Sequence, residues 1–356
     1  MTQLSQIYLV MLLITTLSGC TTLGYYSQAV SGHLSLMMST QPVSQLLDAP
    51  STPPALQQKL SVAHEARRFA ANRLALPVGD AFSSYAELGR PWVVVNLVAA
   101  PEFSLEAHRW CYPVVGCQAY RGYYQLEKAK KEEQSFLARG YDTFIGGVTA
   151  YSTLGWFDDP LHTGFTSLSD NRMVALMFHE LAHRVVYIND DTAFNESFAT
   201  AVELEGLRLW LEQQGDDQGF QRALARLRQR NQTLTLVETA SGQLEALYRQ
   251  QDTLSTARLR QQKARIFQTL RDNYRALSAD WDQPGPFGED PAELNNANLA
   301  LFSQYNQHVP AFRQLLREQD GDFRAFYAAV ERLSEQPQKE RLTILAQLRQ
   351  HFHENL

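Results

Sequence analysis

The chain is organised around the segment Phe178-His179-Glu180-Leu181-Ala182-His183-Arg184, which is followed closely by Asn195-Glu196-Ser197-Phe198-Ala199. The first segment has the pattern His-Glu-x-x-His. In a helix, residues four apart lie one turn apart on the same face, so His179 and His183 project in the same direction. The flanking residues, from Met173 to Val186, are mostly apolar and predict a largely buried helix. Two histidines and a glutamate inside such a helix need partners.

These residue types at this spacing indicate a metal site. Two neutral imidazoles one turn apart bind a single Zn²⁺, and the adjacent Glu180 reaches a water molecule there as a general base. Because so short a pattern also arises by chance, the second segment is important. Glu196 follows a turn-rich stretch, residues 189–192, which we expect to reverse the chain and bring a second helix alongside the first. We therefore predict one zinc ion on His179, His183 and Glu196, with its fourth position open for water.

The second helix also offers partners for the ligand histidines. Thr200 lies about one turn and Glu203 about two turns beyond Glu196, on the same side of the helix. Either side chain is placed to accept a hydrogen bond from a ligand imidazole. The alternative is a solvated Glu203.

Strand-like runs precede the metal-binding helix and predict a small mixed sheet. Residues 92–100 form the most strand-like run, and residues 110–117, 119–124 and 144–156 follow it. The charged segment Leu126–Arg139 between them is typical of a surface helix. In the last run, Thr149, Ala150 and Tyr151 are the candidates for an edge that pairs with an extended peptide substrate. An ordinary buried strand with no free edge is the alternative.

The rest of the chain is predominantly helical in pattern. Residues 215–280 predict an antiparallel hairpin of two long helices, broken near Ser241-Gly242 or near Gln251-Asp252-Thr253. The fold class is therefore α+β, mostly α, with the small sheet beside a zinc-binding helix pair. We expect residues 20–210 to carry the sheet and the metal site, and residues 211–356 to form a helical part packed on them.

An export signal is predicted at the start of the chain. The apolar run Ile7–Ile14 is too short to span a bilayer. It leads into Leu17-Ser18-Gly19-Cys20, which looks like the lipobox of bacterial lipoproteins and implies removal of residues 1–19 and a lipid anchor on Cys20. Thr21 in place of Asp implies the outer membrane of a Gram-negative cell, facing the periplasm. The alternative is a generic secretory signal with an incidental cysteine, since residues 1–5 lack Lys and Arg.

Cysteine count and net charge agree with such a location. Of the three cysteines, Cys111 and Cys117 remain as a pair once Cys20 carries lipid, and an oxidising compartment favours a disulfide between them. The formal net charge of −6 argues against a nucleic-acid partner.

The motif pair resembles the gluzincin zinc peptidases. Together with the lipobox, Tyr25-Tyr26-x-Gln28-Ala29, Asn295-Asn296-Ala297 and Tyr305, it resembles a bacterial family of predicted zinc aminopeptidases over essentially the whole mature chain. The resemblance implies zinc-dependent peptide hydrolysis. The chain departs from the family pattern at Thr200, where thermolysin-like relatives have Asp. It also departs at residues 147–151, which lack the Glu that well-known aminopeptidases of the clan use to hold the substrate's α-amino group.

The expected mechanism uses Glu180 to move a proton and a second donor to stabilise the oxyanion. Tyr305 is the first choice for that donor, with His308 and His162 as rivals. Residues 295–312, rich in Asn, Tyr and His, are a candidate to return to the active site. Two other functions remain open: a zinc-binding envelope scaffold without turnover, and a metalloendopeptidase that acts on cell-wall or periplasmic peptides.

Overall fold

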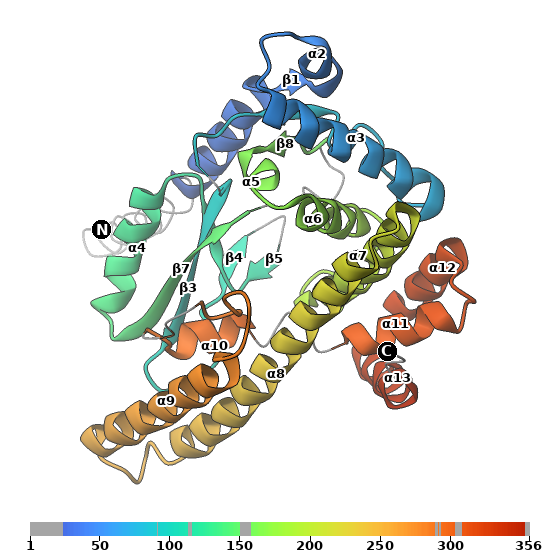
Figure 1. Ribbon diagram of the computed structural model, residues 1–356. Coiled ribbons are helices and arrows are strands. Elements are labelled where there is room, and N and C mark those ends of the chain that lie inside the picture. Colours follow the sequence, from blue (N-terminus) through green and yellow to red (C-terminus); the bar gives the residue numbers. More distant parts are fainter. Residues whose placement is uncertain are drawn as a thin grey trace, which may run out of the picture.

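Helices make up most of the molecule (Figure 1). The computed structural model describes residues 24–90, 92–112, 116–149, 158–288, 291, 293–302 and 308–352. The predicted α+β fold with mostly α structure is confirmed. Within the described part of the chain, no helix combines the length and the apolar content that crossing a membrane requires.

A three-stranded antiparallel sheet lies beside the helices, in the order β6-β3-β7. The central strand β3 (Val94–Pro101) pairs with β6 (Arg121–Tyr123) on one side and with β7 (Tyr141–Val148) on the other. Among the described residues β7 therefore has one free edge. α4 (Leu126–Leu137) packs on the sheet, as the charged segment predicted. β7 ends before Thr149, and Ala150 and Tyr151 lie outside the described residues.

Residues 110–117, predicted as a further strand of the sheet, instead form most of a separate hairpin. β4 (Trp110–Tyr112) pairs with β5 (Gly116–Gln118), with Cys111 opposite Cys117, and a disulfide joins these two cysteines. Gly116 has a φ of +71°, a conformation that glycine adopts without a steric penalty. Because β4 and β5 pair antiparallel with each other, this run does not extend along β3.

The His-Glu-x-x-His motif and Glu196 lie on two helices that pack along each other, α6 (Asp170–Ala182) and α7 (Thr192–Gln214). α3 (Pro54–Arg73) packs on α6, and the stacked rings of Phe69 and Phe178 join them. A second three-stranded sheet and three further helical segments complete this part: β1 (Gln41–Pro42), β2 (Ser84–Ala86), β8 (Leu161–His162), residues 24–38, α2 (Val43–Asp48) and α5 (Thr163–Thr166).

The predicted helical hairpin consists of α8 (Asp217–Tyr248) and α9 (Thr256–Ser278). The break falls at the second of the two predicted positions, since Ser241 and Gly242 lie inside α8. In Figure 1 the hairpin extends away from the α6–α7 pair, past the end of the sheet.

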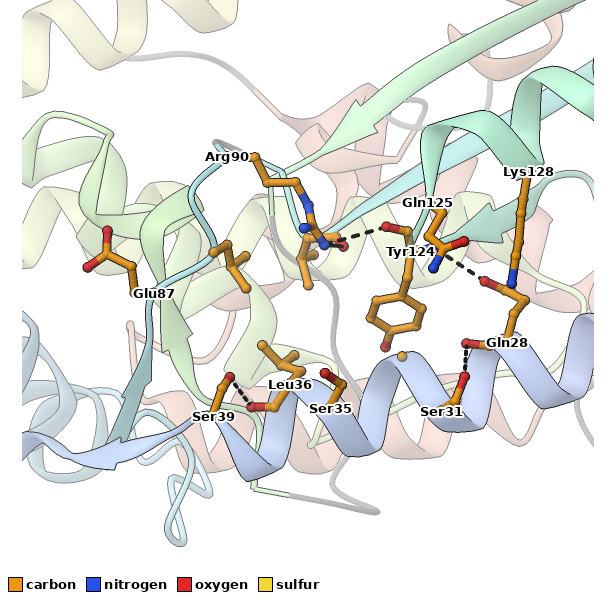
Figure 2. Close-up of a pocket in the computed structure, with 13 residues that line it drawn as sticks. Gln28, Ser31, Ser35, Leu36, Ser39, Glu87, Arg90, Tyr124, Gln125 and Lys128 are labelled. Carbon is orange, nitrogen blue, oxygen red and sulfur yellow. Dashed lines mark hydrogen bonds between the residues drawn. The ribbon is translucent and has the colours of Figure 1, made fainter.

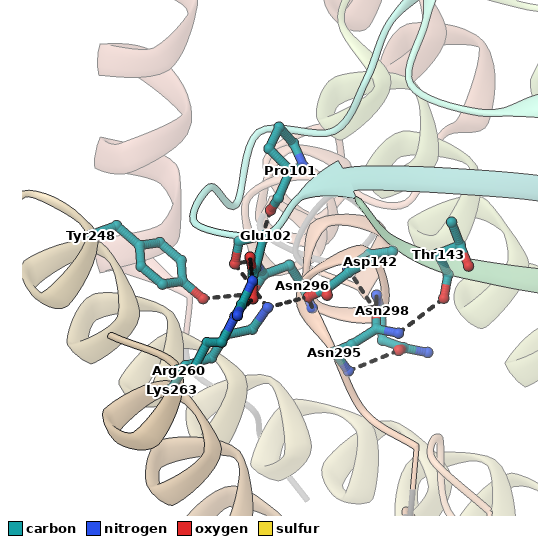
Figure 3. A network of polar contacts seen from close by, with 11 residues as sticks. Pro101, Glu102, Asp142, Thr143, Tyr248, Arg260, Lys263, Asn295, Asn296 and Asn298 are labelled. Carbon is teal, nitrogen blue, oxygen red and sulfur yellow. Dashed lines mark hydrogen bonds and ion pairs between the residues drawn. The ribbon is translucent and has the colours of Figure 1, made fainter. Parts of the chain in front are cut away.

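A polar network ties this hairpin to the sheet (Figure 3). Asn296, at the start of α10 (Asn296–Phe302), is fully buried, and its Nδ2 donates to the carbonyl oxygens of Pro101 and Glu102 at 3.0 Å each. The Tyr248 hydroxyl donates to Asn296 Oδ1 at 2.8 Å. Lys263 Nζ lies 2.6 Å from Asp142 Oδ2. The network therefore connects α8, α9 and α10 to β7 and the end of β3.

The last three helices share the core of the metal-binding helices. α11 (Val309–Arg317), α12 (Phe323–Ser334) and α13 (Gln338–His351) contribute Phe312, Phe326 and Leu345 to the same buried cluster as α6 and α7. A buried ion pair also joins Arg313 Nε to Glu205 Oε1 on α7 at 2.7 Å. Residues 210 and 211, on either side of the predicted boundary, both lie inside α7.

Candidate metal centre

The turn between α6 and α7 is held by side chains of the motif itself. Asn195, 2% exposed, accepts from Ile188 N through Oδ1 and donates to Ile188 O through Nδ2, both at 2.8 Å. Asp191 caps α7 by accepting from Phe194 N. Its other oxygen, Oδ2, lies 2.5 Å from Arg341 Nη2 on α13. These bonds fix the start of α7 and thereby place Glu196 opposite α6.

The three predicted ligands meet at this point. The Glu196 carboxylate lies between the two imidazoles, with Oε2 at 3.3 Å from His179 Nε2 and Oε1 at 3.7 Å from His183 Nε2. The two rings lie 5.0 Å apart between centroids. His183 is the C-cap of α6, one turn beyond His179. The negative end of the helix dipole therefore favours a cation at this place.

Glu203 supports one of the two histidines. Its Oε2 lies 3.0 Å from His179 Nδ1, a hydrogen bond in which the imidazole is the donor when Nε2 is left free for a ligand bond. The helical spacing offered both Glu203 and Thr200 for this role, and the structure gives this hydrogen bond to Glu203. His183 Nδ1 is buried and has no hydrogen-bond partner in the part of the chain that the structure describes.

The donor set fits a single metal ion. A tetrahedral Zn²⁺ with ligand bonds of about 2.0–2.2 Å holds neighbouring donor atoms about 3.4 Å apart. One ligand atom from each of His179, His183 and Glu196 lies within 4.8 Å of the others. Two imidazoles and one carboxylate are ligands that Zn²⁺ accepts. The structure is therefore compatible with one metal ion on these residues.

The pKa values of His179, His183 and Glu196 depend on the charges of one another. Burial lowers the pKa of His179, but hydrogen bonds to Glu196 and Glu203 outweigh it and raise that pKa well above its usual value. Burial, and next the charge of His179, lowers the pKa of His183 to about 4. Burial raises the pKa of Glu196, yet the hydrogen bond from His179 and the histidine charges leave it below its usual value.

Glu180 lies beside this group on α6. Burial raises the pKa of its carboxyl to about 8, and the charges of Glu196, Asp159 and Glu203 act in the same direction. Glu180 is 9% exposed and forms no hydrogen bond with any described residue. The charge of His179 acts in the opposite direction and favours the ionised carboxylate, the form in which a general base accepts a proton.

Two phenols near the metal centre were not predicted as site residues. Burial raises the pKa of Tyr120, with further contributions in the same direction from Glu196, Tyr187, Tyr25 and Glu180. Burial and the Glu196 charge likewise raise the pKa of Tyr187. Tyr120 precedes β6 and Tyr187 lies in the turn after α6, so no spacing in the sequence relates them to His179.

Of the three predicted oxyanion donors, the structure describes His162 and His308. Tyr305 lies outside the described residues. His162 is buried at the end of β8, where its Nδ1 accepts from Gly164 N at 3.1 Å and its ring packs against Phe165. The backbone of His308 donates to Ser197 Oγ at 3.1 Å, at the base of α11.

Asn295 and Asn296 bind backbone groups at the end of the β6-β3-β7 sheet. Asn295 Nδ2 donates to Thr143 O in β7 at 2.9 Å, and Asn296 Nδ2 donates to the carbonyl oxygens of Pro101 and Glu102 at the end of β3 (Figure 3). These side chains satisfy backbone groups at a sheet end that α10 covers, which explains their polarity. The return of residues 295–312 to the active site stays a prediction, since residues 303–307 lie outside the described part of the chain.

A cavity of about 500 Å³ lies away from the metal ligands, between the helix of residues 24–38 and the segment before β3 (Figure 2). Arg90 points into this region but is engaged with backbone carbonyls, among them Trp92 O at 3.1 Å. Gln28 accepts from Tyr124 N at 3.3 Å and closes another part of the wall. None of the metal ligands lines this cavity.

A family model described as "Putative aminopeptidase" matches residues 24–345. The chain belongs to this aminopeptidase family. The matched region includes α6, α7, the β6-β3-β7 sheet and α10, and it begins after the predicted signal segment. Neither a curated protein nor a solved structure shows significant similarity to the chain. Family membership indicates a peptidase that acts on peptide substrates.

Proposed function

We propose that this member of the aminopeptidase family is a zinc-dependent peptidase whose metal is held by His179, His183 and Glu196. The observation that carries the proposal is the Glu196 carboxylate shared between two imidazole Nε2 atoms, at 3.3 and 3.7 Å. A catalytic zinc site of this composition has three protein ligands and one position for water. When bound, Zn²⁺ supplies a water of lowered pKa and polarises the scissile carbonyl.

Glu180 moves the proton in the proposed reaction. Its carboxylate accepts a proton from the attacking water and donates it to the nitrogen of the leaving amine. Glu203 keeps the proton of His179 on Nδ1, so that Nε2 retains its lone pair. This assignment uses Glu180 for proton transfer and Glu203 for orientation.

The developing oxyanion needs a hydrogen-bond donor from the protein. Tyr120 is the candidate that the described residues support, because its phenol lies within electrostatic reach of both Glu196 and Glu180. The raised pKa keeps that phenol protonated and able to donate. Tyr305, predicted from the sequence, remains the second candidate.

The free edge of β7 is the proposed platform for the substrate backbone. An extended peptide pairs with an edge strand through main-chain hydrogen bonds. β7 continues toward Thr149, whose carbonyl would lie 2.5 Å from a Cβ added at Gly164, close to the start of α5. Thr149, Ala150 and Tyr151 are therefore proposed to hold the peptide next to the metal centre.

Metal analysis and a peptide digest test the proposal. The purified protein is expected to contain one zinc per chain and to cleave peptides, and removal of zinc by a chelator should stop cleavage until zinc is restored. Peptides with free and with blocked N-termini distinguish the activities. Cleavage of free N-termini alone identifies an aminopeptidase, and cleavage of both identifies an endopeptidase. Bound zinc with no cleavage of any peptide contradicts the enzyme and favours a zinc-binding scaffold.

The predicted lipid anchor on Cys20 and the outer-membrane location form a separate part of the proposal. Cys20 lies outside the described residues. Incorporation of labelled fatty acid into the wild-type protein, and its loss in Cys20→Ser, would support the anchor. Equal labelling of both proteins would contradict it.

A further inference from the structure

A pocket of about 290 Å³ opens beside the metal centre, between α6, α7 and α8. Its buried lining is mostly apolar and includes Ala175, Leu204 and Leu227 beside the polar Thr200, whereas the arginines that line it are more exposed. The pocket therefore has an apolar floor and a charged rim. Thr149, at the end of the proposed substrate strand, also lines it.

Helical spacing makes this pocket continuous with the metal site. On α6, Arg172 and Leu176 line the pocket, and His179 follows on the same face, one turn beyond Leu176. On α7, Thr200 and Glu203 lie one and two turns beyond Glu196 and also line it. A peptide held at the metal centre therefore has this pocket within reach of its neighbouring residues.

Positive charge dominates the pocket. Arg172, Arg226 and Arg230 line it, and Glu203 is the acidic residue among the lining side chains. That carboxylate already accepts from His179 Nδ1 at 3.0 Å. Arg226 and Arg230 lie one turn apart on α8 and face the pocket together with Ala223 and Leu227 on the same helix face.

Two of these arginines are available to a ligand. Within the described residues, Arg172 and Arg226 form neither an ion pair nor a hydrogen bond. Burial lowers the pKa of Arg226, the charges of Arg172 and Arg222 lower it further, and the charge of Glu203 raises it. The Arg230 charge is among those that lower the Glu196 pKa, so it acts on the metal centre too.

We propose that this pocket binds a carboxylate of the substrate, so that the enzyme prefers peptides with an acidic group close to the scissile bond. This specificity rests on the proposed function as a zinc peptidase. Arginine guanidinium groups bind carboxylates with paired, charge-assisted hydrogen bonds. The apolar floor accommodates the methylene groups of a glutamate-like side chain.

The carboxylate has two possible sources, an acidic side chain and the C-terminal carboxylate of a short peptide. Arg172 lies two turns from His179, about 10 Å along the helix axis. An extended peptide covers about 3.3 Å per residue. Both sources are therefore within reach when the acidic group lies one to three residues from the cleaved bond.

Four matched tripeptides separate the two sources. They have the form Ala-X-Ala, with X as Glu or Gln, and each ends in a free carboxylate or an amide. The wild-type protein with zinc bound is expected to show a kcat/KM about 10–100-fold higher for a peptide with the recognised carboxylate than for its amide partner, because charged hydrogen bonds contribute about 1.5–3 kcal/mol. The pair of peptides that shows the difference identifies the source.

The double variant Arg172→Gln and Arg226→Gln tests the residues. It should raise KM for the preferred peptide and remove the preference, while kcat/KM for the peptide lacking both carboxylates stays within about twofold. Arg228→Gln is the matched control, because Arg228 is an exposed arginine of α8 that does not line the pocket. Equal kcat/KM for all four peptides in the wild type, or an unchanged preference in the double variant, would overturn the proposal.

A binding measurement separates failure of this inference from failure of the proposed function. The same peptides, fluorescently labelled, are titrated against Glu180→Gln protein loaded with zinc, which requires no turnover. Carboxylate-dependent binding that the double variant loses would support the pocket even if no peptide were cleaved. Equal dissociation constants for carboxylate and amide peptides would contradict the pocket even if hydrolysis were observed.

Discussion

The α6–α7 helix pair and the α10 segment both contain polar side chains that are shielded from solvent, but these side chains have opposite roles. In α6 and α7, one ligand atom from each of His179, His183 and Glu196 lies within 4.8 Å of the others. In α10, Asn296 uses its side-chain amide on backbone carbonyls and a tyrosine hydroxyl. The comparison indicates that polar residues at regular spacing on one helix face predict a metal site better than a run of polar residues without such spacing does.

Glu180→Gln should give the largest functional effect. Gln cannot accept and return the water proton, so kcat should fall by about 10²–10⁴-fold. Zinc content should stay at the wild-type level, because Glu180 is not one of the predicted ligands. Steady-state kinetics and metal analysis of the same preparation measure both quantities. Retained activity would remove Glu180 from the mechanism and weaken the distinction between the two regions.

Tyr120→Phe tests whether the Tyr120 phenol is the hydrogen-bond donor to the oxyanion. Loss of one oxyanion donor should lower kcat by about 10²-fold and leave KM nearly unchanged. Tyr187→Phe is the matched comparison, because Tyr187 lies near the same carboxylate but is 42% exposed. If Tyr187→Phe lowers kcat and Tyr120→Phe does not, the oxyanion donor is assigned to the wrong tyrosine.

Glu203→Gln should weaken metal binding without removing a ligand. The neutral amide orients the His179 imidazole less strongly, so zinc affinity should fall by about 10–100-fold in a competition titration with a chelator. Glu212→Gln on the same helix, with a side chain that is 68% exposed, is the control. An unchanged zinc affinity in Glu203→Gln would show that the hydrogen bond to His179 Nδ1 does not support the site.

Asn296→Ala should affect stability and leave catalysis intact. The substitution leaves two backbone carbonyls and the Tyr248 hydroxyl without their buried partner, at a cost of about 2–4 kcal/mol in the free energy of unfolding. Urea denaturation measures this loss, and kcat per folded molecule should stay within about twofold. Asn298→Ala, which removes one bond to Asn295 N, should cost less. Loss of kcat at unchanged stability would place α10 at the active site after all.

His162→Asn should give the smallest effect, visible in the pH dependence of stability. Burial, and next the charge of Arg90, lowers the pKa of His162 to about 4, compared with about 6.5 in the unfolded chain. Between these values the unfolded state binds more protons, so the stabilisation is present above pH 6.5 and is lost as the pH falls toward 4. Urea unfolding should show that the variant lacks about 1–3 kcal/mol of the wild-type loss in the free energy of unfolding between pH 6.5 and pH 4. Identical pH profiles would contradict the neutral, structural role of His162.

The sequence predicted those parts of the molecule that depend on local spacing. His179 and His183 share a helix face because residues four apart do so, and Glu203 became a candidate because it lies two turns beyond Glu196. The break between α8 and α9 falls near Gln251-Asp252-Thr253, where polar residues interrupt the helical pattern. In each case the determining interactions lie within a few residues along the chain.

Contacts between distant segments could not be predicted in the same way. The charge of Glu196 acts on the pKa of Tyr120, and Asn296 contacts Pro101, only because the sheet and the helices pack in one particular arrangement. The composition of residues 295–312 contains no information on which carbonyl groups its amides satisfy. The arginine pocket likewise arises where α8 crosses α6 and α7, although Arg172 and Arg226 are far apart in sequence.

The ion pair between Asp191 and Arg341 has a consequence for the order in which the molecule becomes active. A ribosome produces His179, His183 and Glu196 well before Arg341. Asp191 caps the helix that carries Glu196, and its second oxygen is held by α13, which is the last helix that the structure describes. We expect the third metal ligand to reach its final position only when α13 docks. The metal centre would thus remain incomplete, and the chain inactive, until α13 has docked.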